Sequence, residues 1–126
     1  MLTYKNNDPY IEGTSLYDLV KVCQTPFYVY SQQKIINQVN KTKEILGNNI
    51  FYSIKSNSNQ AILKLMNSLD IGADVVSVGE LKRALEAGFD PNKIIFEGVG
   101  KSEQDLLYAM HKNCLLYTSP SPRDRW

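Results

Sequence analysis

Two hydrophobic periods alternate along the chain, and turn residues separate them. After a proline, residues 25–31 (TPFYVYS) are β-branched and aromatic, which predicts a strand. Residues 32–46 then place apolar side chains at helical spacing, with Ser31 as the N-cap and Gly47 at the end. The regular part of the chain is therefore predicted to open with a strand and a helix.

The same succession recurs three times. Further strands are predicted in NIFYSIK, ADVVS and KIIFEG, and further helices in NQAILKLMNSL, GELKRALEAGFD and SEQDLLYAM, the last capped by Ser102. The predicted strands end at Lys55, Ser77 and Gly98, at intervals of about twenty residues, the length of a short βα unit. This alternation predicts an α/β fold with a parallel sheet, either open and doubly wound or closed as a barrel.

Ligands of parallel α/β folds bind at the carboxyl ends of the strands. We therefore expect Lys55, Asp74, Ser77, Glu97 and Gly98 at one edge of the sheet. A lysine at the end of an apolar strand is most simply a strand reaching water, but such an amine can also be a covalent catalyst, and convergence at one edge favours the second interpretation. No GxGxxG or GxxxxGK[ST] motif follows these strands, which argues against a dinucleotide or P-loop site.

Composition narrows the class of protein. Of the 126 residues, 43% are hydrophobic and 21% charged, which is typical of a globular domain. A net charge of +1 provides no field for nucleic acid or a membrane surface, so neither is an expected partner. The N-terminus has no signal-peptide pattern, and Cys23 and Cys114 suggest reduced thiols without a metal site. We expect a cytoplasmic protein.

The last thirteen residues, CLLYTSPSPRDRW, lose the periodicity and are rich in Ser, Pro and Arg. They resemble the translation of a sequencing-library adaptor. Residues 114–126 are accordingly expected to be a non-native tail and are excluded from the predicted fold. Native sequence is expected to stop near Asn113.

Four blocks together resemble the start of the diaminopimelate decarboxylase branch of the pyridoxal-phosphate decarboxylases, which have the alanine-racemase-like fold. The blocks are TPFYVYS, FYSIKSNSNQAIL, GADVVSVGELKRALEAG and KIIFEGVGKSEQDLLYAM. The resemblance implies the first βα units of a truncated (β/α)8 TIM-type barrel. It also implies a lyase with the cofactor pyridoxal 5'-phosphate that converts meso-diaminopimelate to L-lysine and CO2, and a homodimer at full length. Alternatives are an ornithine- or arginine-type decarboxylase, or a non-catalytic barrel that binds pyridoxal phosphate.

The same resemblance suggests roles for individual residues. Lys55 would be the catalytic lysine that binds the aldehyde of the cofactor, and Asp74 would be the acidic residue beside it, unless it is a simple turn carboxylate. Asn57 and Ser77 would line the cofactor site or only satisfy turn backbone. His111, the single histidine, matches no catalytic position and is expected on a helix surface.

The resemblance also predicts the domain organisation. Residues 1–26 are expected to be an extended lead-in belonging to an incomplete β-domain, and residues 27–113 a partial pyridoxal-phosphate-binding barrel. The phosphate loop of the family and its partner for the pyridine nitrogen match no part of the chain, so these 126 residues alone are expected to be inactive.

Overall fold

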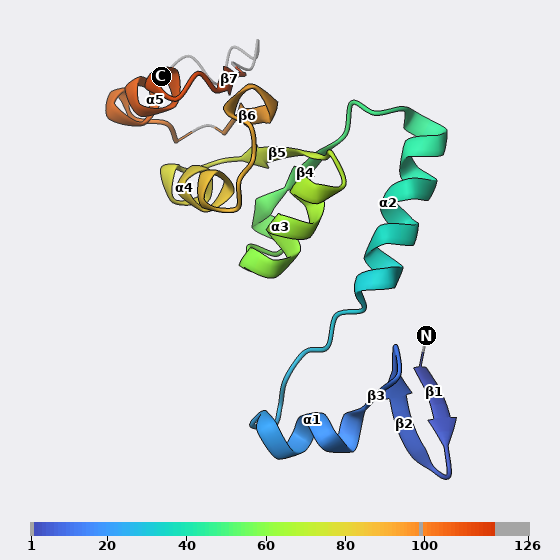
Figure 1. Cartoon of the computed structure of the whole chain (residues 1–126). Helices are drawn as coiled ribbons and strands as arrows, with labels where there is room; N and C mark the ends of the chain where they lie inside the picture. Colours follow the sequence, from blue (N-terminus) through green and yellow to red (C-terminus); the bar gives the residue numbers. More distant parts are fainter. Residues whose placement is uncertain (1, 99, 118–126) are drawn as a thin grey trace. The chain divides into compact units, whose positions relative to one another are not determined.

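The computed structural model describes residues 2–98 and 100–117 (Figure 1). The chain forms two compact units that part after Ile45, at the end of a long helix. Within the described ranges, no helix is long and apolar enough to cross a lipid bilayer. Each unit is described by itself below.

The first unit opens with a three-stranded antiparallel sheet in the order β1-β2-β3. Its elements are β1 (Leu2–Lys5), β2 (Asp8–Ile11), β3 (Thr14–Ser15) and the helix α1 (Leu16–Val22). Asn6 and Asn7, with φ of 50° and 65°, form the first two-residue turn, as asparagine tolerates the left-handed conformation. Within the expected lead-in, residues 1–26, the structure thus has a small sheet and the helix α1, which the sequence did not predict. The assignment of these residues to a β-domain stays a prediction.

Residues 27–31 form no strand in the structure, although their side chains favour one. A strand needs a neighbour for its backbone N–H and C=O groups, and no described strand pairs with this segment. The predicted strand at residues 25–31 is therefore wrong for this chain, because propensity without a partner does not make a sheet.

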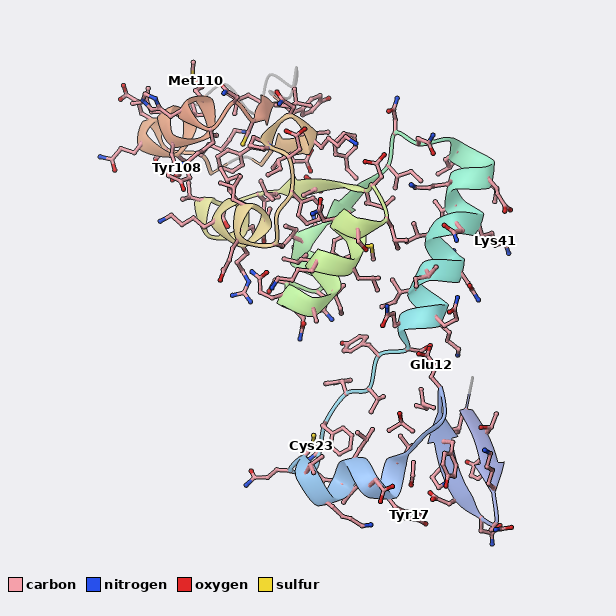
Figure 2. The ribbon with its side chains drawn as sticks, in the orientation of Figure 1. Glu12, Tyr17, Cys23, Lys41, Tyr108 and Met110 are labelled. Carbon is pink, nitrogen blue, oxygen red and sulfur yellow. The ribbon has the colours of Figure 1, made fainter. Side chains whose placement is uncertain are left out.

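The helix that follows is confirmed as α2 (Gln32–Leu46). The Ser31 hydroxyl accepts the Lys34 N–H at 3.1 Å, as an N-cap does, and Gly47 adopts a φ of 80° beyond the last turn. The Glu12 carboxylate adds a second cap, since it accepts the Gln33 N–H at 2.9 Å and the Ser31 hydroxyl (Figure 2). The bond from Ser31 lowers the pKa of Glu12.

The second unit contains a four-stranded parallel sheet in the order β4-β5-β6-β7, with a helix between each strand and the next (Figure 1). The strands are β4 (Phe51–Ser53), β5 (Gly72–Val75), β6 (Ile94–Phe96) and β7 (Leu115–Leu116). The helices are α3 (Gln60–Ser68), α4 (Val78–Glu86) and α5 (Glu103–His111), with 3-10 turns η1 (Ile54–Ser56) and η2 (Pro91–Lys93). The predicted α/β order and parallel sheet are confirmed. The strands follow one another across the sheet without reversal, as in a (β/α)8 barrel.

One face of this sheet forms the core. Ala73, Val75, Ile94 and Phe96 are fully buried on it, and α4 contacts both β5 and β6. Because side chains alternate across a strand, the opposite face carries the remaining positions of the same strands. That face is less buried, and it is where polar side chains occur within the strands.

Cys114 to Tyr117 belong to the fold, contrary to the prediction that excluded them. Leu115 pairs with Ile95 and Leu116 with Phe96, so β7 extends the sheet. Cys114 is buried, and this burial raises the pKa of its thiol. Residues 118–126, the rest of the expected tail, lie outside the described residues, and the non-native origin of the tail stays a prediction.

Candidate functional site

Each predicted strand ends about two residues earlier than expected. β4 stops at Ser53, and Lys55 lies in the 3-10 turn η1 that follows directly. Ile54 is fully buried and anchors this turn, whereas the Lys55 side chain is exposed. The prediction that Lys55 is the last strand residue is therefore wrong, because Lys55 lies in the short turn after the strand. Its backbone is fixed by the sheet and the core, and its amine is accessible.

Two side-chain hydrogen bonds close the turn around Lys55. The Ser56 hydroxyl donates to the Ser53 carbonyl at 2.7 Å, and the Tyr52 hydroxyl donates to the Asn57 carbonyl at 3.0 Å. Tyr52 thus supports the turn from the end of β4. The backbone of residues 53–57 is thus held from both ends.

Asp74 lies on β5, the neighbouring strand, directly opposite Ser53 in the parallel register. The turn η1 contacts β5, so the strand that carries Asp74 and the turn that carries Lys55 lie side by side. The Asp74 Oδ1 atom is buried and has no hydrogen-bond partner among the described residues, and the same is true of Ser53 Oγ. Buried polar atoms are normally paired, so two unpaired ones on adjacent strands mark this edge of the sheet as a candidate site.

Asn57 and Ser77 both use a side-chain oxygen for local backbone bonds. Asn57 Oδ1 accepts the Asn59 N–H at 3.0 Å, and Ser77 Oγ accepts the Glu80 N–H at 3.2 Å as the N-cap of α4. These contacts are those of the simpler alternative, in which both residues satisfy turn backbone. Their assignment to the cofactor site stays a prediction.

The segment after β6 completes the carboxyl edge. The Glu97 N–H donates to the Val75 carbonyl at 2.9 Å and prolongs the ladder by one residue. Gly98 has a φ of 109°, which a side chain would strain. The Lys101 ammonium donates to the Gly98 carbonyl at 2.6 Å and to the Tyr117 carbonyl at 3.2 Å, so this lysine ties the loop after β6 to the end of β7. Lys101 is therefore committed to structure, whereas no such bond holds Lys55 in the part of the chain that the structure describes.

The side chains at this edge of the sheet fit the aldehyde end of pyridoxal phosphate. The cofactor aldehyde requires an amine, which Lys55 supplies, and a positive nitrogen is stabilised by a nearby carboxylate, which Asp74 supplies with an unpaired oxygen. The phosphate requires several free N–H groups, most often at a helix N-terminus. At α3, α4 and α5 an early N–H group is already bound by Asn59, Ser77 or Ser102. The described residues thus fit the aldehyde end and provide no dedicated phosphate cradle.

His111 lies in the last turn of α5 and is exposed, as expected of a surface residue. Ser53 is the site residue that the sequence reading missed. Its position two residues before the lysine could have indicated it, because that spacing places it on the less buried face of β4. Its pairing with Asp74 on β5 follows only from the register of the sheet.

Comparison with known proteins identifies the family to which the chain belongs. The family model described as pyridoxal-dependent decarboxylase, pyridoxal binding domain, matches residues 32–122. Diaminopimelate decarboxylase of Aquifex aeolicus is 36% identical over 124 residues, 98% of this chain and 30% of the relative. The Helicobacter pylori enzyme of the same name is 44% identical over 101 residues, 78% of this chain and 25% of the relative.

Solved structures give the same result. Diaminopimelate decarboxylase from Helicobacter pylori, crystallised with L-lysine, aligns with a TM-score of 0.75 and 38% identity, covering 82% of this chain and 28% of that one. The M. jannaschii enzyme, also with L-lysine, aligns with a TM-score of 0.85 and 29% identity, covering 94% of this chain and 30% of that one. The chain thus spans no more than about a third of the relatives it matches. With a family model over most of its length, the chain belongs to the pyridoxal-dependent decarboxylases and contains part of their pyridoxal-binding domain.

Proposed function

We propose that this chain is part of a pyridoxal-phosphate-dependent carboxy-lyase that converts meso-diaminopimelate to L-lysine and CO2. The observation that carries the proposal is the accessible Lys55 amine on η1, beside the strand whose Asp74 has a buried, unpaired oxygen. The names of the relatives and the L-lysine held by two solved relatives support the choice of substrate.

Lys55 would hold the cofactor through a C=N bond between its amine nitrogen and the aldehyde carbon, with the aldehyde oxygen released as water. Asp74 would place its negative charge beside the Lys55 nitrogen and stabilise positive charge there. When bound, pyridoxal phosphate supplies an electron sink that accepts the electrons left as the substrate carboxylate departs as CO2. Lys55, once displaced by the substrate amine, would carry a proton to or from the reacting carbon.

The surroundings of the lysine would serve its orientation. Tyr52 and Ser56 keep η1 closed, which limits the positions that the Lys55 amine can sample. Asn57 and Ser77 would contact the cofactor with the side-chain hydrogens that their backbone bonds leave free, the amide NH2 of Asn57 and the hydroxyl hydrogen of Ser77.

The wider assignments follow from the same proposal. Residues 27–113 would form part of a pyridoxal-phosphate-binding barrel, and residues 1–26 part of a second, β-rich domain. The enzyme would act as a homodimer in the cytoplasm on a small-molecule amino acid, without nucleic acid or a membrane as partner. An ornithine- or arginine-type decarboxylase and a non-catalytic cofactor-binding barrel are the alternatives that an assay must separate.

The test uses the gene product that contains this sequence, purified with pyridoxal phosphate. CO2 release is measured from meso-diaminopimelate, ornithine and arginine. We expect release from meso-diaminopimelate to exceed the other two, and Lys55→Ala to lower kcat by at least about 10²–10⁴-fold. Lys64→Ala, which removes an exposed lysine on α3, is the matched control and should keep full activity.

Three results would contradict the proposal. Faster release from ornithine or arginine would transfer the substrate assignment to that branch. Undiminished CO2 release by Lys55→Ala would remove the catalytic role of this lysine, and bound cofactor without CO2 release from any of the three substrates would favour the non-catalytic barrel.

A further inference from the structure

Ser53 and Asp74 form a polar pair on the less buried face of the parallel sheet. They are directly opposite each other on β4 and β5, and partners in a parallel register project to the same face. Each has one buried side-chain oxygen, Ser53 Oγ and Asp74 Oδ1, without a partner in the described part of the chain.

The two unpaired oxygens are chemically complementary. An ionised carboxylate only accepts hydrogen bonds, and a serine hydroxyl carries a donor hydrogen that rotates freely. Adjacent strands lie about 4.8 Å apart, so a rotamer change at Ser53 can bring its hydroxyl toward the Asp74 carboxylate. A bond from a hydroxyl to a carboxylate is charge-assisted and stronger than one between neutral groups.

The local fold does not require the Ser53 hydroxyl. The turn η1 is closed by the hydroxyls of Ser56 and Tyr52, and the apolar core lies on the other face of the sheet. An alanine at position 53 would satisfy the same strand geometry. The Ser53 hydroxyl therefore has no structural role in the local fold. It lies next to the Asp74 carboxylate of the proposed site and two residues before Lys55.

We infer that Ser53 is a positioning residue: its hydroxyl donates a hydrogen bond to the Asp74 carboxylate in the cofactor-loaded protein and holds that carboxylate toward the Lys55 nitrogen. The inference rests on the proposed function, because it assumes that Lys55 and Asp74 act on pyridoxal phosphate. Ser53 acts through Asp74 and touches neither cofactor nor substrate.

A double-mutant cycle on the gene product that contains this chain tests the inference, with the dissociation constant of pyridoxal phosphate as readout. We expect Ser53→Ala to weaken cofactor binding about tenfold, the effect of losing one hydrogen bond to a charged group. In the Asp74→Asn background the same substitution should change the constant less than about twofold. Ser53→Thr, which keeps a hydroxyl, should restore binding, and the unfolding midpoint of the cofactor-free protein should be the same for Ser53→Ala and the unmodified protein.

The possible outcomes distinguish failure of the Ser53 role from failure of the proposed function. An unchanged constant in Ser53→Ala, or an equal loss in both backgrounds, overturns the role of Ser53 and leaves the proposed function intact. A lowered unfolding midpoint of the cofactor-free Ser53→Ala protein, with failure of Ser53→Thr to restore binding, also overturns it, because the residue would then be structural. Failure of the unmodified protein to bind pyridoxal phosphate overturns both proposals.

Discussion

Tyr52 supports Lys55 through a single bond that can be removed without changing the shape of the side chain. Its hydroxyl donates to the Asn57 carbonyl at 3.0 Å across the turn η1. We expect Tyr52→Phe to lower the free energy of unfolding by about 1 kcal/mol, because the part-buried carbonyl loses its partner. The turn should also open more often, so that borohydride fixes less pyridoxal phosphate on Lys55.

The matched control is Tyr28→Phe. Tyr28 is 90% exposed, and its hydroxyl makes no hydrogen bond within the described residues. Urea unfolding and borohydride incorporation should both be unchanged in this variant. Equal behaviour of the two variants would show that the Tyr52 bond contributes nothing to the turn.

For single residues, the sequence indicated the candidate site residues but not the contacts that they make. Lys55 and Asp74 were predicted because carboxyl ends of parallel strands converge and because the surrounding blocks resemble a family. The local bonds of Asn57 and Ser77 were weighed as an alternative and are present. Ser53 could not be identified, because serine within a strand has no distinctive pattern and its partner is 21 positions away in the sequence.

Between elements, β4 and β5 approach so closely that only glycine fits at position 72. A Cβ atom there would lie 2.4 Å from the Phe51 ring and 2.8 Å from the Lys93 carbonyl oxygen. We expect Gly72→Ala to cost about 1–3 kcal/mol of stability, because the ring and the backbone must both shift. The urea midpoint of the gene product measures the loss.

Gly79→Ala is the control for that substitution. Gly79 lies in the first turn of α4, and the nearest atom to an added Cβ would be Ser77 Oγ at 3.7 Å. Alanine favours a helix over glycine by up to about 1 kcal/mol, so this variant should be as stable as the original or more so. A Gly72→Ala protein with the same midpoint as Gly79→Ala would contradict the close approach of the two strands.

The N-terminus of α5 makes stability depend on pH. Asp105 accepts the Ser102 N–H at 2.9 Å, and this bond lowers the pKa of the carboxyl. Because the folded pKa lies below the unfolded one, the contact stabilises the fold above the unfolded pKa, and that contribution is lost as pH falls through the folded value. We expect Asp105→Asn to weaken the acid dependence of the unfolding midpoint, and Glu103→Gln, on the same turn, to preserve more of it. A larger loss of acid dependence in Glu103→Gln than in Asp105→Asn would contradict the role of the reciprocal bonds between Ser102 and Asp105.

Helices were easier to predict than strands. Ser31, Asn59 and Ser102 cap helices at or next to the predicted starts, because a cap depends on neighbours a few positions away. A strand depends on a distant partner, which is why residues 25–31 were predicted as a strand that does not form and β7 was missed. The seven residues of α1 were too short a run to establish a helical period.

In the molecule as a whole, the described part of the parallel sheet has two open edges. Within the described residues β4 and β7 each pair with one neighbour only, and Phe51, Leu115 and Leu116 are exposed large apolar residues on these two strands. Open edges with apolar side chains pair readily with other chains. A polypeptide of these 126 residues alone is therefore expected to self-associate and to release no CO2 from meso-diaminopimelate. Sedimentation velocity measures the association, and a monomer with a cooperative unfolding transition would contradict it.

Most of the second unit was predictable from the sequence, since the alternation of strands and helices already implies a parallel sheet. The division after Ile45, at the end of α2, was not predicted, because the boundary expected between residues 26 and 27 came from the resemblance to a family and not from the contacts of this chain. The sequence equally indicated no phosphate site in the second unit, where a side chain already binds an early N–H group at the starts of α3, α4 and α5.

The central claim is that Lys55 binds pyridoxal phosphate covalently. The direct measurement is borohydride reduction of the cofactor-loaded gene product, followed by proteolysis and mass spectrometry of every lysine-containing peptide. We expect the pyridoxyl label to fall on Lys55, to be lost in Lys55→Ala and to be kept in Lys64→Ala. A label on another lysine, or its retention in Lys55→Ala, would contradict the account.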